Sequence, residues 1–464
     1  MSFIAYCNYK TTHTPEFNKI PDSWGFKALK HIVAIPITDG PHETPEFLDE
    51  GVLFISAEAV SKGEINFSKA RFIARDEHRR YSRKYSPKRG DIFMVKSGAT
   101  TGVVAIVETD RDFSIWSPLA AIRCETIANP RFIFHAMRSR NFQESVTLNW
   151  SFGTQQNIGM AVLENLGIPF PPLAEQTQIA RFLDHETAKI DTLIHEQKRL
   201  IELLKEKRQA VISHAVTKGL DPDVPMKDSG VEWLGEVPAH WSVEPLKYLC
   251  SFSGGGTPAK ENLEYWNGDI PWVSPKDMKS FRISGSKDKI TGLALNESST
   301  SLVKAGALLM VVRSGILQRT IPIGINSVDV TLNQDMKALR FKNPDFAEYF
   351  AYFIKGYEPS LLIEWRKQGA TVESIEQEYL GESLTLVPPL NEVAKIIEHL
   401  SHVDQRYGSL QAEAKKSSAM LLERRSALIS AAVTGKIDVR NWQPPADERV
   451  FDEEMRQAEM KVIA

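Results

Sequence analysis

The chain has 464 residues with a net charge of −3 at pH 7 and 42% hydrophobic residues, the composition of an ordinary globular protein with two or three domains. No stretch is long and apolar enough to span a bilayer, and three isolated cysteines favour neither a disulfide framework nor a zinc site. The slight acidity excludes a uniformly basic nucleic-acid binder, so DNA contact would require basic and acidic residues on different faces. The N-terminus lacks secretory signal features, and we expect a cytoplasmic protein.

Residues 1–172 are predicted to form a mixed α/β domain, which we call the first head. Its first 20 or so residues are expected to be loosely structured, and the domain begins at Ile20-Pro21-Asp22-Ser23-Trp24. Short β-branched or aromatic runs predict strands at 52–55, 91–95 and 102–107, and an Asn-Pro opening predicts a helix over 130–144.

A basic stretch lies between residues 69 and 89, where nine Lys and Arg residues face only two acidic ones. Cationic side chains neutralise DNA phosphates, and the interleaved His and Tyr residues can stack or wedge. The alternative is a solvated charged loop. If the stretch binds DNA, we expect the contacts to include Arg79, Arg80, Arg83 and Lys84.

Two polar loops follow in the first head. The loop 96–102 is flanked by Gly and rich in small hydroxyls, which suits close approach to a ligand, although a hairpin turn explains it as well. The loop 151–157 carries Gln and Asn side chains, which can pair bidentately with adenine in the major groove. The candidate DNA contacts in these loops are Lys96, Ser97, Thr100, Thr101, Gln155 and Gln156.

A long helix is predicted over 173–217, after the opening Pro171-Pro172-Leu173-Ala174-Glu175-Gln176. The 44 residues from 174 to 217 would make a rod of roughly 65 Å, which cannot bury its apolar stripe without a partner. Steps of 3, 4 and 7 residues are typical of a coiled coil, although polar residues interrupt the register. The predicted seam consists of Ile179, Leu183, Ile190, Leu193, Leu200, Leu204 and Val211.

The partner is a second helix predicted over 390–434 of the same chain. Pro388-Pro389-Leu390 repeats Pro171-Pro172-Leu173, the same shift aligns the two helices without a gap, and the helix ends repeat best. Gly408 within the second helix costs about 1 kcal/mol relative to Ala, which leaves the local regularity of the helix open. The predicted seam here consists of Ile396, Leu400, Leu410, Leu421 and Leu428.

Residues 218–389 are predicted to form a second head, which begins with a Gly/Pro/Asp-rich connector, and residues 435–464 a polar tail. Strands are expected at 270–273, 307–312 and 321–325, and a helix over 344–355. The heads match each other less well than the helices do. Counterparts of the polar loops give the candidate DNA contacts Arg313, Ser314, Gln318, Arg319, Arg366 and Lys367.

Motifs of catalysis are missing from the sequence. It has no phosphate-binding Gly-rich loop, no dinucleotide fingerprint, no Asn/Asp-Pro-Pro-Tyr/Phe, no Gly-x-Ser-x-Gly and no His-Glu-x-x-His. His185 and His402 occupy equivalent repeat positions, where packing explains a histidine better than metal binding. Nothing in the sequence therefore argues for an enzyme or a metal site.

Specific motifs recur in combination along the chain. They are 166–176, Ile190-Asp191, 204–210, 215–219, 235–241 and Lys88-Arg89-Gly90-Asp91-Ile92. With two diverged heads on two similar antiparallel helices, the chain resembles the DNA-specificity subunit of type I restriction–modification systems over nearly its whole length. The second repeat departs at Asn391-Glu392-Val393, where Ala-Glu-Gln is expected, and at Tyr407-Gly408, which replaces Ile-Asp.

The resemblance implies an α+β fold with a pseudo-two-fold internal repeat and no catalytic residues. Each head would be a target recognition domain for one half of a split, asymmetric double-stranded DNA site, and the coiled coil would set the gap. Two methyltransferase subunits would dock on the outer helix faces and the tail. They, not this chain, would bind the cofactor S-adenosylmethionine. Two motor-nuclease restriction subunits could join, and no membrane is involved.

Three alternatives remain open at the level of sequence. The first is a scaffold whose coiled coil carries two ligand-binding heads without DNA, which would suit the net acidity. The second is an enzyme with an unrecognised site. The third keeps the resemblance but places the chain in a system that only methylates DNA.

Overall fold

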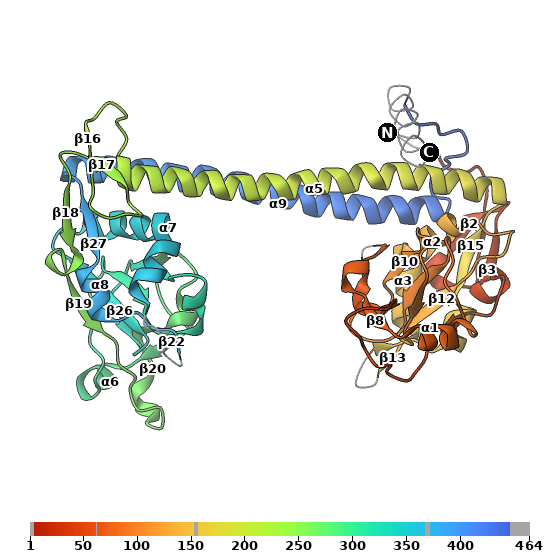
Figure 1. The fold of residues 1–464 in the computed structure, drawn as a ribbon, viewed down its shortest axis with the longest axis horizontal. Coiled ribbons are helices and arrows are strands. Elements are labelled where there is room, and N and C mark those ends of the chain that lie inside the picture. The colour runs from red at the N-terminus through yellow and green to blue at the C-terminus, as the bar shows by residue number, and fades with distance from the viewer. Residues whose placement is uncertain (1–3, 62, 153–155, 367–371, 446–464) are drawn as a thin grey trace. The chain divides into compact units, whose positions relative to one another are not determined.

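The computed structural model describes residues 4–61, 63–152, 156–366 and 372–445. The chain divides into two compact units, of which the first comprises 1–197 with 416–464 and the second 198–415. In each unit a head of strands and short helices packs against parts of the two long helices α5 and α9 (Figure 1). The predicted fold class, two mixed α/β heads with two long helices and an internal repeat, is confirmed.

The first unit is built from short strands and helices that lead into α5. Its elements are β1 (Tyr9–Thr11), β2 (Lys19–Pro21), β3 (Gly25–Ala28), β4 (Thr38–Asp39), β5 (Val52–Ile55), β6 (Val60–Ser61), β7 (Glu64–Ile65), β8 (Arg71–Ile73), α1 (Arg75–Ser82), β9 (Ile92–Val95), β10 (Val104–Ile106), β11 (Phe113–Ile115), β12 (Leu119–Ile122), α2 (Pro130–Arg138), α3 (Arg140–Asn149), β13 (Ser151–Phe152), β14 (Gln156–Asn157), α4 (Met160–Asn165), β15 (Gly167–Phe170) and α5 (Leu173–Lys218), whose last part lies in the second unit.

The second unit repeats this plan and leads into α9. Its elements are β16 (Met226–Asp228), β17 (Glu236–Pro238), β18 (Ser242–Pro245), β19 (Cys250–Gly254), β20 (Trp266–Val273), β21 (Arg282–Ile283), β22 (Asp288–Ile290), α6 (Gly292–Glu297), β23 (Leu308–Val311), β24 (Ile323–Asn326), β25 (Thr331–Leu332), β26 (Met336–Phe341), α7 (Asp345–Trp365), α8 (Gln377–Glu382), β27 (Leu384–Val387) and α9 (Leu390–Val433), whose last part lies in the first unit.

A central sheet organises each head. In the first head its order is β10-β9-β12-β4, and in the second it is β19-β26-β23-β24-β21. β9 and β23 are buried along their whole length, because helices cover one face and a smaller three-stranded sheet packs near the other. The strands that sequence predicts around 52–55, 91–95 and 307–312 are all present.

The repeat is visible in the strand pair that enters each long helix. β3 pairs antiparallel with β15, and β18 pairs with β27 in the equivalent register, so that Gly25 opposite Phe170 corresponds to Ser242 opposite Val387. In the first repeat the buried amide of Gln176 accepts from the Asn129 backbone N–H at 2.8 Å and donates to the Pro171 carbonyl at 2.8 Å. Val393 is buried at the equivalent position, so an apolar contact replaces these bonds.

Three predicted features differ from the structure. The described N-terminal segment, from residue 4 onward, is ordered, because β1 and β2 form a hairpin, and Ile20 of β2 and Phe17 before it are buried in the core. The helix predicted over 130–144 is two helices, since Ser139 has extended backbone angles and caps α3 by accepting from the Phe142 N–H. α7 extends beyond the predicted end at 355 as far as Trp365 and is kinked at Tyr357, shortly before Pro359.

The described part of the tail also packs, although it was predicted only as polar. Val439 is buried in the core of the first unit, and the ring of Trp442 contacts Phe182 at 5.2 Å between centroids. The Asp438 backbone N–H donates to the carbonyl of Ile4 at 2.7 Å. The two ends of the described chain therefore lie next to each other and pack against the first part of α5.

The long helices pair antiparallel within each unit. In the first unit Arg425 of α9 contacts Asp191 of α5 at 2.9 Å, and in the second Arg208 of α5 contacts Asp404 of α9 at 2.9 Å. No described helix is long and apolar enough to cross a membrane.

Burial matches the predicted seam in the first part of each long helix and departs from it in the middle, by one residue in α5. Leu193, Leu200 and Leu410 are 50%, 43% and 40% exposed, whereas Ile194 and Ile201 are buried. Leucine and isoleucine stand side by side at 193–194 and at 200–201, so spacing alone cannot choose between them. Of the other predicted seam residues, the buried ones are Ile179, Leu183, Ile190, Ile396 and Leu400, and the partly buried ones are Leu204, Val211, Leu421 and Leu428.

Gly408 does not interrupt α9, which is continuous from Leu390 to Val433. A Cβ built at Gly408 meets nothing within 4 Å. We therefore expect Gly408→Ala to raise the free energy of unfolding by about 1 kcal/mol in chemical denaturation. The matched control is Gly435→Ala, which should destabilise, because Gly435 has φ +69° and its Cβ would lie 2.4 Å from Pro21. A loss of stability in Gly408→Ala would contradict the expectation.

Candidate nucleic-acid interface

The two polar loops of the first head meet beyond the end of β9. Ser97 bridges to Asn157, the Gly98 N–H donates to the Gln156 carbonyl at 3.0 Å, and the Ile158 N–H donates to the Lys96 carbonyl at 2.8 Å. Gly98 has φ +107°, a conformation that favours glycine. Two segments that are far apart in the sequence thus form one surface.

The hydroxyl and amide side chains of this surface differ in what they can reach. Thr100 and Gln156 are exposed, and Ser97 is half-buried. Thr101 turns its hydroxyl inward and donates to the Gly98 carbonyl at 2.7 Å. Thr100 and Gln156 can therefore contact a ligand, whereas Thr101 holds the turn. Gln155 lies outside the described residues.

Lys96 lies at the base of the loop, with its side chain only 13% exposed. Its ammonium lies 3.0 Å from Asp39, and Lys84 contacts the other carboxylate oxygen at 2.7 Å. Burial opposes ionisation of Asp39, but the hydrogen bonds from the two lysines hold its pKa below the ordinary value. The three groups fix the end of β4 to the loop. The main role of Lys96 is therefore to hold the loop in position.

The basic stretch includes β8, α1 and the turn after α1, and four of its nine cations have ion-pair partners within the described part of the chain, namely Arg79, Arg80, Lys84 and Arg89. Arg79 contacts Asp76 at 3.3 Å, and Arg80 contacts Glu43 and Glu77. Arg83 is exposed, and no ion-pair partner for it is found among the described residues. These exposed pairs are weak and can exchange for phosphates. Among the four contacts predicted in this stretch, Arg83 is therefore the best placed for DNA.

The second head builds an equivalent surface beyond the end of β23. The Ser314 N–H donates to the Glu373 carbonyl at 3.1 Å, Arg313 bridges to Ser374, and the Ile375 N–H donates to the Val312 carbonyl at 2.8 Å. The predicted loops again form one surface. Arg366 is exposed and its Nε lies 3.1 Å from Glu373, and Lys367 lies outside the described residues.

The surface in the second head is more cationic than that in the first. Arg313, Gln318 and Arg319 are exposed, while the buried side chain of Leu317 anchors the turn that carries them. Ser314 accepts from the Ile316 N–H at 3.4 Å and caps this turn. Equivalent scaffolds thus present different side chains, small hydroxyls in one head and arginines in the other.

Within the described residues no group of three or more His, Cys, Asp and Glu side chains could hold a metal ion. The surfaces offer hydrogen-bond donors, acceptors and charge.

The chain is similar to a known protein family over both repeats. The family described as the type I restriction modification DNA specificity domain matches residues 21–203 and 238–416, which is more than half of the chain and covers both repeats. The chain belongs to this family.

The relatives of this specificity-domain chain agree with the assignment. The type I restriction enzyme EcoR124I/EcoR124II specificity subunit of Escherichia coli is 34% identical over 245 residues, which is 52% of this chain and 55% of that subunit. The chain thus matches about half the length of that relative. The putative MjaX specificity subunit of Methanocaldococcus jannaschii is 24% identical over 95% of this chain and 99% of that one.

A solved structure shares the fold. It was determined to explain complex assembly and conformational transition of the type I R-M system, and it is 17% identical with a TM-score of 0.65 over 90% of this chain and 99% of that one. At this identity the similarity establishes only the fold of the specificity-domain chain. The contacts of its loops are described from its own residues.

The residues that support the loops carry no motif by which the sequence of this specificity-domain chain predicts them. Glu358 of α7 accepts from the Thr320 hydroxyl and from the Ile321 N–H, both at 2.6 Å, and so fixes the end of the second-head loop. Asp39 does the same for the first head. The one sequence feature that could have predicted the supporting roles of Asp39 and Glu358 is that each is an acidic residue close to an apolar run.

Proposed function

We propose that the chain is the DNA-reading subunit of a type I restriction–modification complex and is not itself catalytic. Each head reads one half of an asymmetric, bipartite duplex site. The observation that carries the proposal is the pair of equivalent loop surfaces beyond β9 and β23, which share a scaffold but present different side chains.

The chemistry of the surfaces supports two unlike half-sites. Arginine can pair bidentately with guanine and glutamine with adenine in the major groove, which favours Arg313, Gln318 and Arg319 as base readers in the second head. Thr100 and Gln156 offer hydroxyl and amide groups in the first. A symmetric dimer would read a palindrome, whereas two different heads in one chain read unlike halves.

The partners follow from the same proposal. Two methyltransferase subunits bind S-adenosylmethionine and dock on the exposed faces of α5 and α9, and restriction subunits can join them in the cytoplasm. The family and the names of its specificity subunits support a place in such a complex.

The test is a methylation map. The chain is co-expressed with the methyltransferase encoded beside it, and methylated adenines in the host DNA are mapped. We expect one motif of two short, unlike halves with a fixed gap. The variant Arg313→Ala/Gln318→Ala/Arg319→Ala should relax the second half only, since each wrong base pair costs about 1–3 kcal/mol.

Two controls sharpen the map. A variant Thr100→Ala/Gln156→Ala should relax the first half and leave the second intact, and cells with an inactive methyltransferase should show no motif. Folded, co-purifying proteins that give no bipartite motif would contradict the proposal and favour the scaffold alternative.

A further inference from the structure

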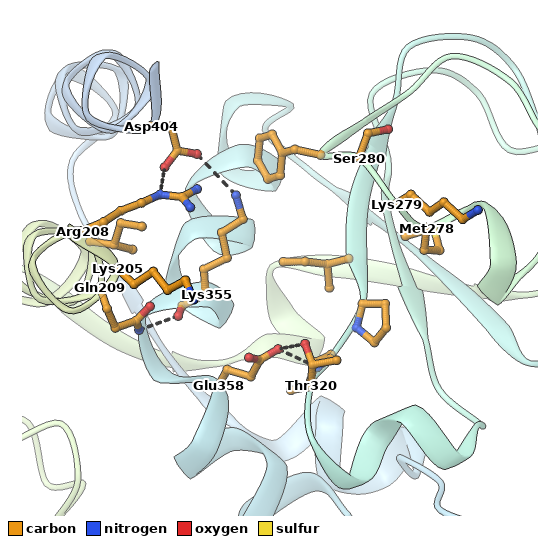
Figure 2. A pocket seen from close by; sticks show the side chains of 15 residues that line it. Lys205, Arg208, Gln209, Met278, Lys279, Ser280, Thr320, Lys355, Glu358 and Asp404 are labelled. Carbon is orange, nitrogen blue, oxygen red and sulfur yellow. Dashed lines mark hydrogen bonds and ion pairs between the residues drawn. The ribbon is translucent and has the colours of Figure 1, made fainter. Parts of the chain in front are cut away.

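A cavity of about 520 Å³ lies in the second unit where α5 passes the second head. Lys205 and Arg208 of α5, Lys355 of α7 and Asp404 of α9 line it, and the segment 320–323 forms another wall. Figure 2 shows Lys205, Arg208 and Lys355 reaching into the same space, with Asp404 beside them.

One carboxylate serves two of these cations. Arg208 Nε donates to Asp404 Oδ1 at 2.9 Å, while Lys355 Nζ lies 3.5 Å from Asp404 Oδ2. Burial lowers the pKa of Lys355, Asp404 opposes this shift, and the neighbouring Arg208 adds to it. The cluster therefore carries an excess of positive charge in a partly desolvated place.

The remaining charges do not cancel this excess. Glu358 adds a negative charge to the wall, where it accepts from the Thr320 hydroxyl and from the backbone N–H of the next residue. Lys279 also lines the cavity, however, so four cationic residues of the described lining face two carboxylates. Lys205 contacts Glu202 at 2.8 Å, but both side chains are more than half exposed, and such pairs are weak and screened. An anion would find two or three cationic donors here.

The wall of the cavity follows directly, along the chain, on the loop proposed to read DNA. Thr320 directly follows the exposed Arg319, and Ile323 begins β24 of the central sheet. If bases reach Arg319, the neighbouring DNA backbone would lie close to the wall that begins at Thr320. Resting on the proposed function, we propose that the cavity binds one backbone phosphate of the DNA beside the second half-site, held by Lys205, Arg208 and Lys355.

Such a contact positions the duplex without reading its sequence. Phosphate contacts fix the register of a protein on DNA, and base contacts specify the site. Because Lys205 and Arg208 belong to the long helix and Lys355 to the head, one phosphate would tie both to the duplex. The register of the second half-site is then set from the coiled coil as well as from the loops.

The first test is a salt titration with Lys205→Ala in the complex with the methyltransferase. Each phosphate contact contributes about 0.9 to the slope of log affinity against log salt, so the slope should fall by about 1, equally for cognate and unrelated duplexes. The methylated motif should not change. The matched control is Lys304→Ala, which removes another exposed, paired lysine of the same unit, 2.7 Å from Asp329 and at the opposite end of β23.

The second test locates the phosphate. Duplexes with single neutral methylphosphonates are scanned across the site. We expect one position beside the second half whose neutralisation weakens wild-type binding but adds nothing to Lys205→Ala. Lys205→Arg should retain the coupling. If Lys205→Ala matches Lys304→Ala and no position couples, the proposal is wrong.

A free anion is the other source of the same chemistry. If millimolar inorganic phosphate raises the melting temperature of the wild type but not of Lys205→Ala, and no methylphosphonate couples, the cavity is a small-anion site and the DNA assignment is overturned. A wild-type complex that binds no bipartite duplex would overturn the proposed function as well, whereas normal half-site specificity without coupling overturns this inference alone.

Discussion

Replacing Asp91 with alanine is expected to destabilise the first head by about 3–5 kcal/mol, because it removes one partner of a buried ion pair. The carboxylate accepts from Arg123 at 2.8 and 2.6 Å, from the Tyr85 hydroxyl at 2.6 Å and from the Lys88 N–H at 2.8 Å. Each donor would lose its partner where water has little access. Hydrogen exchange of the β9 and β12 amides measures the loss within this head.

The second repeat shows how the loss can be offset. β23 is preceded by Ala307, buried where the first repeat has Asp91 before β9, so the same sheet forms there without a carboxylate. The variant Asp91→Ala/Tyr85→Phe/Arg123→Leu removes the two side-chain donors together with the acceptor and leaves only the Lys88 backbone N–H of the network. We expect it to recover much of the stability, since apolar replacement of a buried ion pair is often neutral.

The effect of Asp91→Ala on DNA recognition should be limited to the first half-site. β9 leads directly into the loop at 96–102, so loosening it should blur the first half of the methylated motif and leave the second half unchanged. A loss of less than about 1 kcal/mol, or equal damage to both halves, would contradict this role of Asp91.

Sequence alone predicts the repeat and the long helices because their signals are local. Pro171-Pro172 and Pro388-Pro389 restrict the chain where each helix begins, and Gly219 and Gly435, with φ +72° and +69°, follow the helix ends. Such signals act within a few residues, so they survive without knowledge of the tertiary structure.

The features that sequence missed depend on contacts between distant segments. Leu193 and Ile194 are equally apolar, and only packing against α9 buries the isoleucine. The N-terminal hairpin is polar along β1, and what orders it is the burial of Phe17 and Ile20 in a core built largely from residues much later in the chain.

The candidate site was predictable to a similar extent. Composition identified the polar loops, and the structure pairs each with its partner loop. Composition does not predict the ion pair between Asp39 and Lys96 or the cavity that Lys205 and Lys355 share, because the members of each pair belong to segments that are far apart in the sequence.

Lengthening both long helices by three heptads is expected to abolish binding to the original site and to create a site whose gap is about nine or ten base pairs longer. α5 and α9 both run from one unit into the other, and 21 extra residues add roughly 32 Å at about 1.5 Å per residue. One turn of B-DNA is about 34 Å, so this length brings the second head back to nearly the same face of the duplex.

The positions at which the heptads are inserted follow from the buried seam residues Ile194, Ile201 and Ala414. Three copies of 194–200 inserted after Leu200 keep Ile194 and Ile201 in phase, and three copies of 407–413 inserted before the buried Ala414 do so in α9. Both points lie in the second unit, and the ion pairs Asp191–Arg425 and Arg208–Asp404 place them opposite each other.

The methylation map again gives the readout. Both half-sites should be retained while the gap grows, because neither head is altered, and affinity for the original duplex should fall at least about 10³-fold toward non-specific binding. Inserting the heptads in α5 alone leaves α9 too short to pair, and should cost folding instead of moving the gap. An unchanged gap in the folded double insertion would mean that the DNA, not the coiled coil, sets the distance between the halves.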